Sequence, residues 1–198
     1  KNLDSTYNWA VYHKDLTSAA YYLFLNNTDG QSNNFYTYWN STDPSSTVIS
    51  LGADSSDSNV NANKASQSHI CYAWHSVPGL QKFGSYTGNA SANPFIELGF
   101  RPALLWIKNI SSGSTDWVVI DSQRQPFNQS NLTKLYISSA NSESTIGVNS
   151  QMNLDFLSNG FKLRDSNNKV NASGDTYVYC AWAEAPSIDL YGGGANAR

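Results

Sequence analysis

The residues best suited to bind a ligand lie in an aromatic stretch, residues 35–40, with the sequence Phe-Tyr-Thr-Tyr-Trp-Asn. Aromatic rings beside amide and hydroxyl groups suit a sugar-binding surface, because each ring adds an apolar platform to polar neighbours. Strand alternation places Tyr36 and Tyr38 on one side and Trp39 on the other, so one set is expected to be buried. The candidate ligand-binding residues are Tyr36, Tyr38, Trp39 and Asn40.

A second group of polar residues has the chemistry of a metal site. Asp54 and Asp57 lie in a loop rich in Ser and Asn, with two more asparagines close behind. Carboxylate and amide oxygens are the ligands that calcium prefers, although most such loops are solvated turns. Calcium is therefore an option at Asp54 and Asp57, and no cofactor is required. Asp121 and Arg124, which follow an expected strand, are predicted to tie a loop.

Groups for catalysis are few and scattered. Hydrolysis of a glycosidic bond uses two neighbouring carboxyl groups, whereas the three glutamates are dispersed along the chain, at Glu97, Glu143 and Glu184. His69, Cys71 and His75 share one face of an expected strand, but they extend too far along it for one zinc ion. The sequence therefore predicts a protein that is not an enzyme.

The elements that must position these residues occur twice. Three short strings return with an offset of 107 or 108: Lys1-Asn2-Leu3 as Lys108-Asn109-Ile110, Trp9-Ala10-Val11-Tyr12 as Trp117-Val118-Val119-Ile120, and Tyr72-Ala73-Trp74 as Cys180-Ala181-Trp182. Self-similarity at a fixed offset indicates an internal repeat. We expect one domain with a half-unit 1–78, a connector 79–93, a half-unit 94–186 and a C-terminal tail 187–198.

The start of the second half-unit differs from the start of the first. Residues 93–107 end in an apolar run that is typical of a buried strand, and nothing comparable stands ahead of Lys1. The 198 residues are therefore expected to be the C-terminal part of a longer chain.

The composition favours strands and excludes two classes of partner. The net charge of −3 and the even scatter of Lys and Arg exclude a nucleic-acid footprint, and no apolar run is long enough for membrane insertion. Tyr, Trp, Val, Ile and Thr suit strands, which are expected at residues 9–12, 21–25, 35–39, 48–51, 69–75, 95–98, 103–108, 117–121, 134–137, 154–157, 161–163 and 176–183. We predict an all-β fold: a two-sheet antiparallel β-sandwich of the jelly-roll, concanavalin A-like type, built from two similar half-units.

The two cysteines are expected to remain free thiols. They lie in matching strands but one residue out of register, because Cys71 aligns with Tyr179 and Cys180 with Tyr72. Strand alternation then puts them on opposite faces. Free thiols are typical of proteins that fold in a reducing cytoplasm.

Several further motifs follow one another in a fixed order. They are Lys-Phe-Gly-Ser-Tyr-Thr-Gly-Asn at 82–89, Gly-Phe-Arg-Pro-Ala at 99–103, Leu-Ser-Asn-Gly-Phe-Lys at 157–162 and Tyr-Cys-Ala-Trp-Ala-Glu-Ala-Pro at 179–186. The series resembles a family of bacteriophage virion structural proteins, including tail fibre and tail-associated proteins with a C-terminal module like a concanavalin A-type lectin. The resemblance covers essentially the whole chain and carries over no catalytic residue.

The resemblance implies a place on the virion surface after folding in the host cytoplasm. The implied partners are other virion proteins, copies of the chain itself, with a trimer as one option, and a host surface glycan or receptor. The leading function is a tail fibre or appendage domain that contacts the host. The alternatives are a purely architectural capsid-decorating or filament-forming protein and a polysaccharide-degrading enzyme.

Overall fold

The computed structural model describes residues 1–33, 38–52, 62–90, 94–124, 128, 132–145 and 152–186. Every regular element in these residues is a strand, and every strand pair is antiparallel. No helix in this part of the chain is long and apolar enough to span a membrane. The fold is all-β, which confirms the class predicted from composition.

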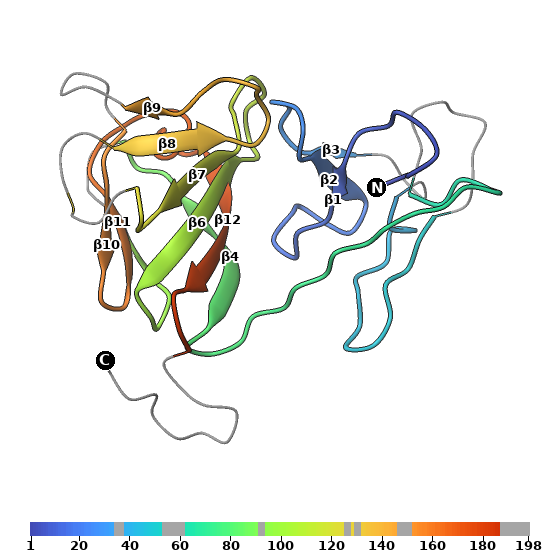
Figure 1. Cartoon of the computed structure of the whole chain (residues 1–198), viewed down its shortest axis with the longest axis horizontal. Coiled ribbons are helices and arrows are strands. Elements are labelled where there is room, and N and C mark those ends of the chain that lie inside the picture. The colour runs from blue at the N-terminus through green and yellow to red at the C-terminus, as the bar shows by residue number, and fades with distance from the viewer. Residues whose placement is uncertain are drawn as a thin grey trace.

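The largest sheet has six strands in the order β4-β12-β6-β7-β8-β9 (Figure 1). Their bounds are Gln81–Thr87 for β4, Thr176–Ala183 for β12, Pro102–Asn109 for β6, Val118–Asp121 for β7, Thr133–Tyr136 for β8 and Ser144–Thr145 for β9. All six strands come from residues beyond the first half-unit. The sheet therefore belongs to the second half-unit together with the connector ahead of it.

A three-stranded sheet covers one face of the large sheet. It has the order β10-β11-β5, with β10 at Leu154–Leu157, β11 at Gly160–Leu163 and β5 at Phe95–Glu97. The main hydrophobic core fills the space between the two sheets and includes Leu105, Ile120 and Phe161, each 0% exposed. This pair of sheets forms the expected antiparallel β-sandwich.

The central strand β12 shows how alternation builds two cores. Tyr177, Tyr179 and Ala181 face the main core, whereas Val178 faces the other side of the sheet and joins a second hydrophobic cluster. The neighbouring strand β4 approaches Tyr179 closely at Gly84, where a Cβ would lie 2.5 Å from the tyrosine oxygen. Only glycine fits there, because any side chain would collide with the ring.

The N-terminal region packs on the outer face of the large sheet. It contains a small sheet, β1-β2-β3, at Ala10–Val11, Tyr21–Phe24 and Ser32–Asn33. Leu16 and Leu23 join the second cluster with Ile110, Trp117 and Val178 of the sandwich. In addition, the Trp117 indole N–H donates to the Phe24 carbonyl at 2.9 Å.

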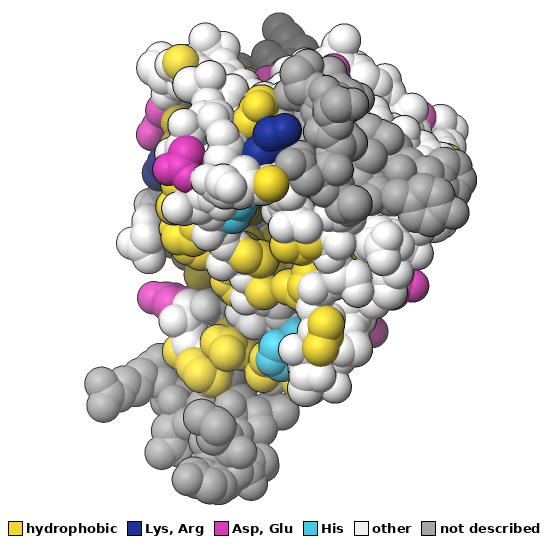
Figure 2. Space-filling model, turned by 90° about the vertical axis from the view of Figure 1, so that its right-hand side faces the viewer, with side chains coloured by type: hydrophobic (Ala, Val, Ile, Leu, Met, Phe, Trp, Pro, Cys, Tyr) yellow, Lys and Arg dark blue, Asp and Glu magenta, His cyan; other side chains and the backbone are white. Residues whose placement is uncertain are grey.

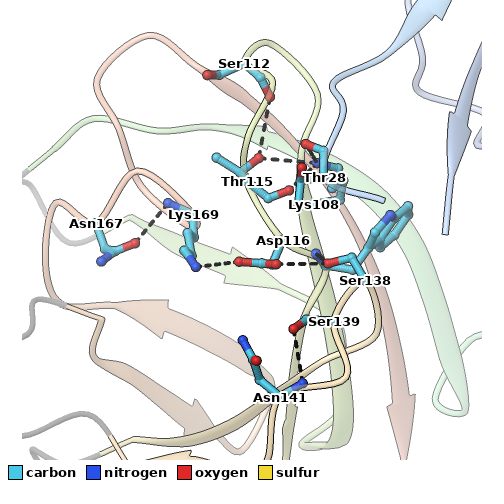
Figure 3. A network of polar contacts seen from close by, with 11 residues as sticks. Thr28, Lys108, Ser112, Thr115, Asp116, Ser138, Ser139, Asn141, Asn167 and Lys169 are labelled. Atoms are coloured by element: carbon cyan, nitrogen blue, oxygen red, sulfur yellow. Dashed lines mark hydrogen bonds and ion pairs between the residues drawn. The ribbon is translucent and has the colours of Figure 1, made fainter. Parts of the chain in front are cut away.

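A buried lysine adds a polar connection between the two regions (Figure 3). Lys108 is 0% exposed, and its Nζ donates to the carbonyls of Thr28, at 3.0 Å, and Thr115, at 2.5 Å. Burial lowers the pKa of Lys108 from 10.5 to about 8, against the attraction of Asp116 and Asp29. Lys108 therefore ties the first half-unit to the second from inside the protein.

The small sheet repeats the outer part of the large sheet in register. The facing pairs correspond one for one: Ala10–Phe24 with Val118–Tyr136, Val11–Leu23 with Val119–Leu135, and Tyr21–Asn33 with Thr133–Thr145. Thus β1, β2 and β3 are the structural counterparts of β7, β8 and β9.

A second stretch also keeps its pairing in both half-units. The Leu3 N–H donates to the Ser68 carbonyl at 2.9 Å, and the counterpart Ile110 N–H donates to Thr176 at 3.0 Å. An isolated bridge joins Asn2 to His69, as β6 joins Asn109 to Tyr177. In the first half-unit this ladder ends at the bond from the Ile70 N–H to the Lys1 carbonyl.

Three sequence predictions are wrong in detail. The predicted strand 69–75 does not form, because the described residues place no strands beside it like β4 and β6, which flank its counterpart β12. Residues 48–51 do not form a strand either. Conversely, the predicted connector 79–93 contains β4, an edge strand of the large sheet.

Candidate functional site

The structure places the predicted sugar-binding residues in different environments. Tyr38 is only 3% exposed, and its ring packs against Tyr22, at a centroid distance of 4.3 Å, and Phe24. Trp39 is half-buried with its ring edge against Tyr12, whereas Asn40 is exposed. Tyr36 lies outside the described residues. Only Trp39 and Asn40 of the described set reach the surface.

The described acid–base candidates do not form a cluster that could hold a metal ion. Asp54 and Asp57 lie outside the described residues, and the described ones contain no group of three side chains that could hold a metal ion. Glu97, Glu143 and Glu184 are all exposed. His13 is buried, which lowers its pKa, and its Nε2 lies 3.3 Å from the Tyr179 carbonyl oxygen.

A row of aromatic side chains lies on the surface where the first half-unit meets the sandwich. We define this aromatic row as Tyr72, Trp74, Trp182 and Phe83. Tyr72 and Trp74 are stacked at 6.1 Å, Trp74 meets Trp182 at 6.4 Å, and Phe83 meets Trp182 at 5.6 Å. Figure 2 shows the hydrophobic side chains gathered in a band on the face that carries the N-terminal region.

Exposure distinguishes the aromatic row from ordinary core. Tyr72 is 57% exposed and Trp74 55% exposed, whereas Trp182 and Phe83 are half-buried. Contiguous exposed aromatic surface of this kind marks interaction sites in soluble proteins. The flanking rings are Trp9, stacked on Tyr72 at 6.5 Å, and Trp106, which meets Trp182 at 5.1 Å.

Polar groups border the aromatic row. His75 is exposed next to Trp74, and its carbonyl accepts a bond from the Gln81 side-chain amide at 2.7 Å. The Ser76 hydroxyl accepts the Phe83 N–H at 3.1 Å. The row thus combines apolar ring faces with imidazole, amide and hydroxyl groups at its rim.

An open hollow of about 480 Å³ lies on the same outer face of the large sheet, beyond Trp106. Its floor is apolar, from residues of β6, β7 and β8 that include Leu104, Val119 and Leu135. Asp121 and Arg124 form its charged side. Leu135 is 37% exposed, so this part of the sheet lacks the cover that the N-terminal region gives to Trp117.

Asp121 and Arg124 form the loop contact expected from their spacing. Asp121 Oδ1 accepts the Arg124 main-chain N–H at 2.8 Å, and Oδ2 accepts its Nε at 2.6 Å. Burial alone would raise the pKa of Asp121, but the bonds from Arg124 outweigh it and lower the pKa. Arg124 Nη1 is buried and has no hydrogen-bond partner among the described residues.

The surface features differ in how much of their chemistry is free to meet a ligand. The aromatic row offers stacking platforms, and the only charged pair at the hollow, within the described chain, is engaged in its own contacts. Trp74 and Trp182 recur at equivalent positions of the repeat, and such recurrence alone is more typical of scaffold residues than of a binding surface. The sequence signal for the aromatic row was strand alternation, which puts Ile70, Tyr72 and Trp74 on one face. Whether that face is exposed depends on the segments that pack beside it.

Comparisons with known proteins give one match. Neither the curated proteins nor the solved structures include a match to the chain. A family model described as "Domain of unknown function (DUF7483)" matches residues 1–186, which span both half-units and the connector between them. The chain therefore belongs to the DUF7483 family.

Proposed function

We propose that the protein is a non-enzymatic surface module of a bacteriophage virion, in a tail fibre or other appendage, which binds host surface glycan through the aromatic row. The observation that carries the proposal is the contiguous exposure of Tyr72 and Trp74 beside Trp182. The C–H-rich face of a sugar ring packs on an aromatic ring, and its hydroxyl groups hydrogen-bond to polar groups at the rim. The ordered sequence motifs support the assignment to a virion.

The free thiols are consistent with folding in the host cytoplasm before assembly. Cys71 is exposed and Cys180 is half-buried, and neither is in a disulfide. Such thiols are typical of proteins that fold in a reducing compartment. The dispersed carboxyl groups support binding without hydrolysis, because a glycosidase needs two of them on either side of one bond.

Glycan-array binding tests this function. The protein is applied to bacterial lipopolysaccharide and capsular glycans, and affinities for any hit are measured by calorimetry. Trp74→Ala and Tyr72→Ala should each weaken binding at least about tenfold, since such side chains dominate binding energies. Phe95→Ala is the matched control, because Phe95 is also exposed, at 45%, but lies on the opposite sheet.

Two other results would decide against the aromatic row. Loss of binding in Trp39→Ala with normal binding in Trp74→Ala would place the site at residues 38–40. Release of reducing sugar from a bound polysaccharide, abolished by Glu97→Gln or Glu184→Gln, would replace the adhesion function with an enzymatic one.

A purely architectural role is the second candidate. It is favoured by a specific observation, the exposure of Leu3, Trp9 and Leu135, whose counterparts in the other half-unit are buried.

A further inference from the structure

The contact between the two half-units provides a template for a contact between molecules. The first half-unit contributes a donor face, formed by Val11, Leu16 and Leu23. The second contributes an acceptor face, formed by Ile110, Trp117 and Val178. Leu16, Leu23 and the whole acceptor face form one buried cluster, with Val11 packed against it. The packing is tight, because Leu23 and Trp117 are each only 1% exposed.

Each face has a counterpart in the other half-unit. Strand register pairs Val11 with Val119 and Leu23 with Leu135, and the repeat offset of 108 pairs Leu16 with Arg124. The second donor face is therefore Val119, Arg124 and Leu135. By the same offsets and the matched ladder, the second acceptor face is Leu3, Trp9 and Ile70.

Most residues of these two counterpart faces are open to solvent, although Val119 is only 9% exposed. Leu3 is 59% exposed and Trp9 37%, and the second donor face lines the hollow on the large sheet. Leu135 is 37% exposed where its counterpart Leu23 is almost completely buried. The chain thus uses one donor face and one acceptor face internally and leaves the other donor face and the other acceptor face largely uncovered.

We propose that the hollow binds the exposed acceptor face of a second copy of this chain. The donor face of the second half-unit would pack on Leu3, Trp9 and Ile70 of the next molecule, as Leu16 and Leu23 pack on Ile110 and Trp117 within one molecule. Charge favours the same contact. Asp4, which is exposed beside Leu3, brings a carboxylate towards the Arg124 guanidinium, whose side chain is 20% exposed at the hollow although its Nη1 is buried.

The contact is heterologous, because two different faces meet. Each molecule offers one donor and one acceptor face, so association continues until a ring closes or a filament grows. An array of this kind would repeat the aromatic row at a regular interval and multiply weak glycan contacts. The proposal does not depend on glycan binding.

Complementary variants test the proposal by sedimentation velocity of the whole chain. The unmodified protein should form species larger than a dimer as its concentration rises. Leu3→Asp blocks the acceptor face and Leu135→Asp blocks the donor face, so each variant alone should weaken association at least about tenfold. An equimolar mixture of the two should form dimers and nothing larger, because one intact face of each kind remains.

Val48→Asp is the control, since Val48 is 60% exposed and belongs to neither face. Circular dichroism and thermal unfolding check that each variant is folded. A monomer at all concentrations, or association that persists in either variant, would overturn the proposal. So would a mixture that forms no dimer.

A disulfide experiment distinguishes contact between molecules from closure within one. Leu3→Cys and Leu135→Cys are introduced separately in a Cys71→Ser background, mixed and oxidised. A cross-linked dimer that requires both variants supports the proposal, whereas its absence contradicts it. With both substitutions in one chain, a bond confined to a monomer would show that the two faces meet internally.

Discussion

The two half-units share strand register but not burial. Trp9 and Trp117 occupy equivalent positions before paired strands, yet Trp9 is 37% exposed and Trp117 only 1%. Tyr72 and Trp74 lie at the surface, whereas their counterparts Cys180 and Trp182 belong to a strand between two others. Similar sequence sets local pairing in both units. The burial of each side chain, and therefore its contribution to stability, depends on which neighbouring strands and faces cover it.

The largest contrast is expected between the two equivalent tryptophans. Trp117→Ala should lower the free energy of unfolding by about 3–5 kcal/mol, because it leaves a cavity and removes the bond to Phe24. Trp9→Ala should cost less than about 1 kcal/mol, as is usual for exposed positions. Denaturant unfolding at low protein concentration measures both. Equal losses would show that Trp9 is buried in solution.

The second expected effect comes from adding a counterpart of β6 ahead of the first half-unit. Fusing the sequence of residues 99–107 ahead of Lys1 should place a β6-like strand beside residues 70–76, in continuation of the Lys1–Ile70 ladder. Several new hydrogen bonds at about 1 kcal/mol each should slow amide exchange at residues 70–76 by roughly 100-fold.

A control extension carries proline at alternate positions, which removes the donors of one edge. Hydrogen-exchange mass spectrometry compares the two fusions. Equal protection in both fusions would mean that residues 70–76 do not pair with an added strand, so the matched ladder does not extend beyond Lys1 and Ile70.

A smaller effect concerns Lys108 and its counterpart Lys1. The folded-state pKa of Lys108 is about 8, below its ordinary value of 10.5, so the unfolded chain binds more protons between these values. The buried Lys108 therefore lowers the free energy of unfolding at pH 8 and below. This penalty becomes smaller as the pH rises from 8 towards 10.5. Lys108→Met should remove this part of the increase in the free energy of unfolding with pH.

The free energy of unfolding is measured for both proteins at pH 8 and pH 9.5. Both pH values lie below the ordinary tyrosine pKa of 10.0. A change of about 1–2 kcal/mol in the free energy of unfolding is expected, since each of the 1.5 pH units contributes at most about 1.4 kcal/mol. Lys1→Met is the control, because the Lys1 side chain bonds only to carbonyls of its own loop, at Asn2 and Ser5. The same pH slope in wild type and Lys108→Met would contradict the assignment.

The smallest effect, without consequence for stability, is expected in thiol reactivity. Burial raises the pKa of the Cys180 thiol to about 12, whereas Cys71 is exposed. Iodoacetamide at pH 8 should modify Cys71 rapidly and leave Cys180 unmodified, as read by peptide mass spectrometry. Equal labelling would show that β12 is less covered than its position in the sheet indicates.

Sequence patterns predict the second half-unit well. The strands β5, β6, β7, β8, β10, β11 and β12 lie within two residues of their expected bounds, because apolar alternation there coincides with burial. The strand β4 was missed, since Gln81, Lys82 and Gly84 are typical of a loop, and Gly84 is explained only by the Tyr179 ring above it.

The candidate site was harder to predict than the fold. The aromatic stretch 35–40 has suitable side chains, but Tyr38 is used in packing against Tyr22 and Phe24. Tyr72 and Trp74 have the alternation of a buried strand but lie at the surface, since residues 70–76 have no strand neighbours within the described part of the chain. Exposure of this kind depends on tertiary arrangement, which no local pattern contains.

The position of β12 also has a consequence for how the protein is made. It is the last of the six strands along the chain, yet it lies between β4 and β6, and β4 precedes it by about ninety residues. During synthesis the edges of β4 and β6 that pair with β12 stay unpaired until β12 has left the ribosome. Long-range pairing of this kind is slow and leaves unpaired edges exposed to aggregation. Completion of the sheet is therefore a late event, and chaperones that shield strand edges should raise the yield of folded protein.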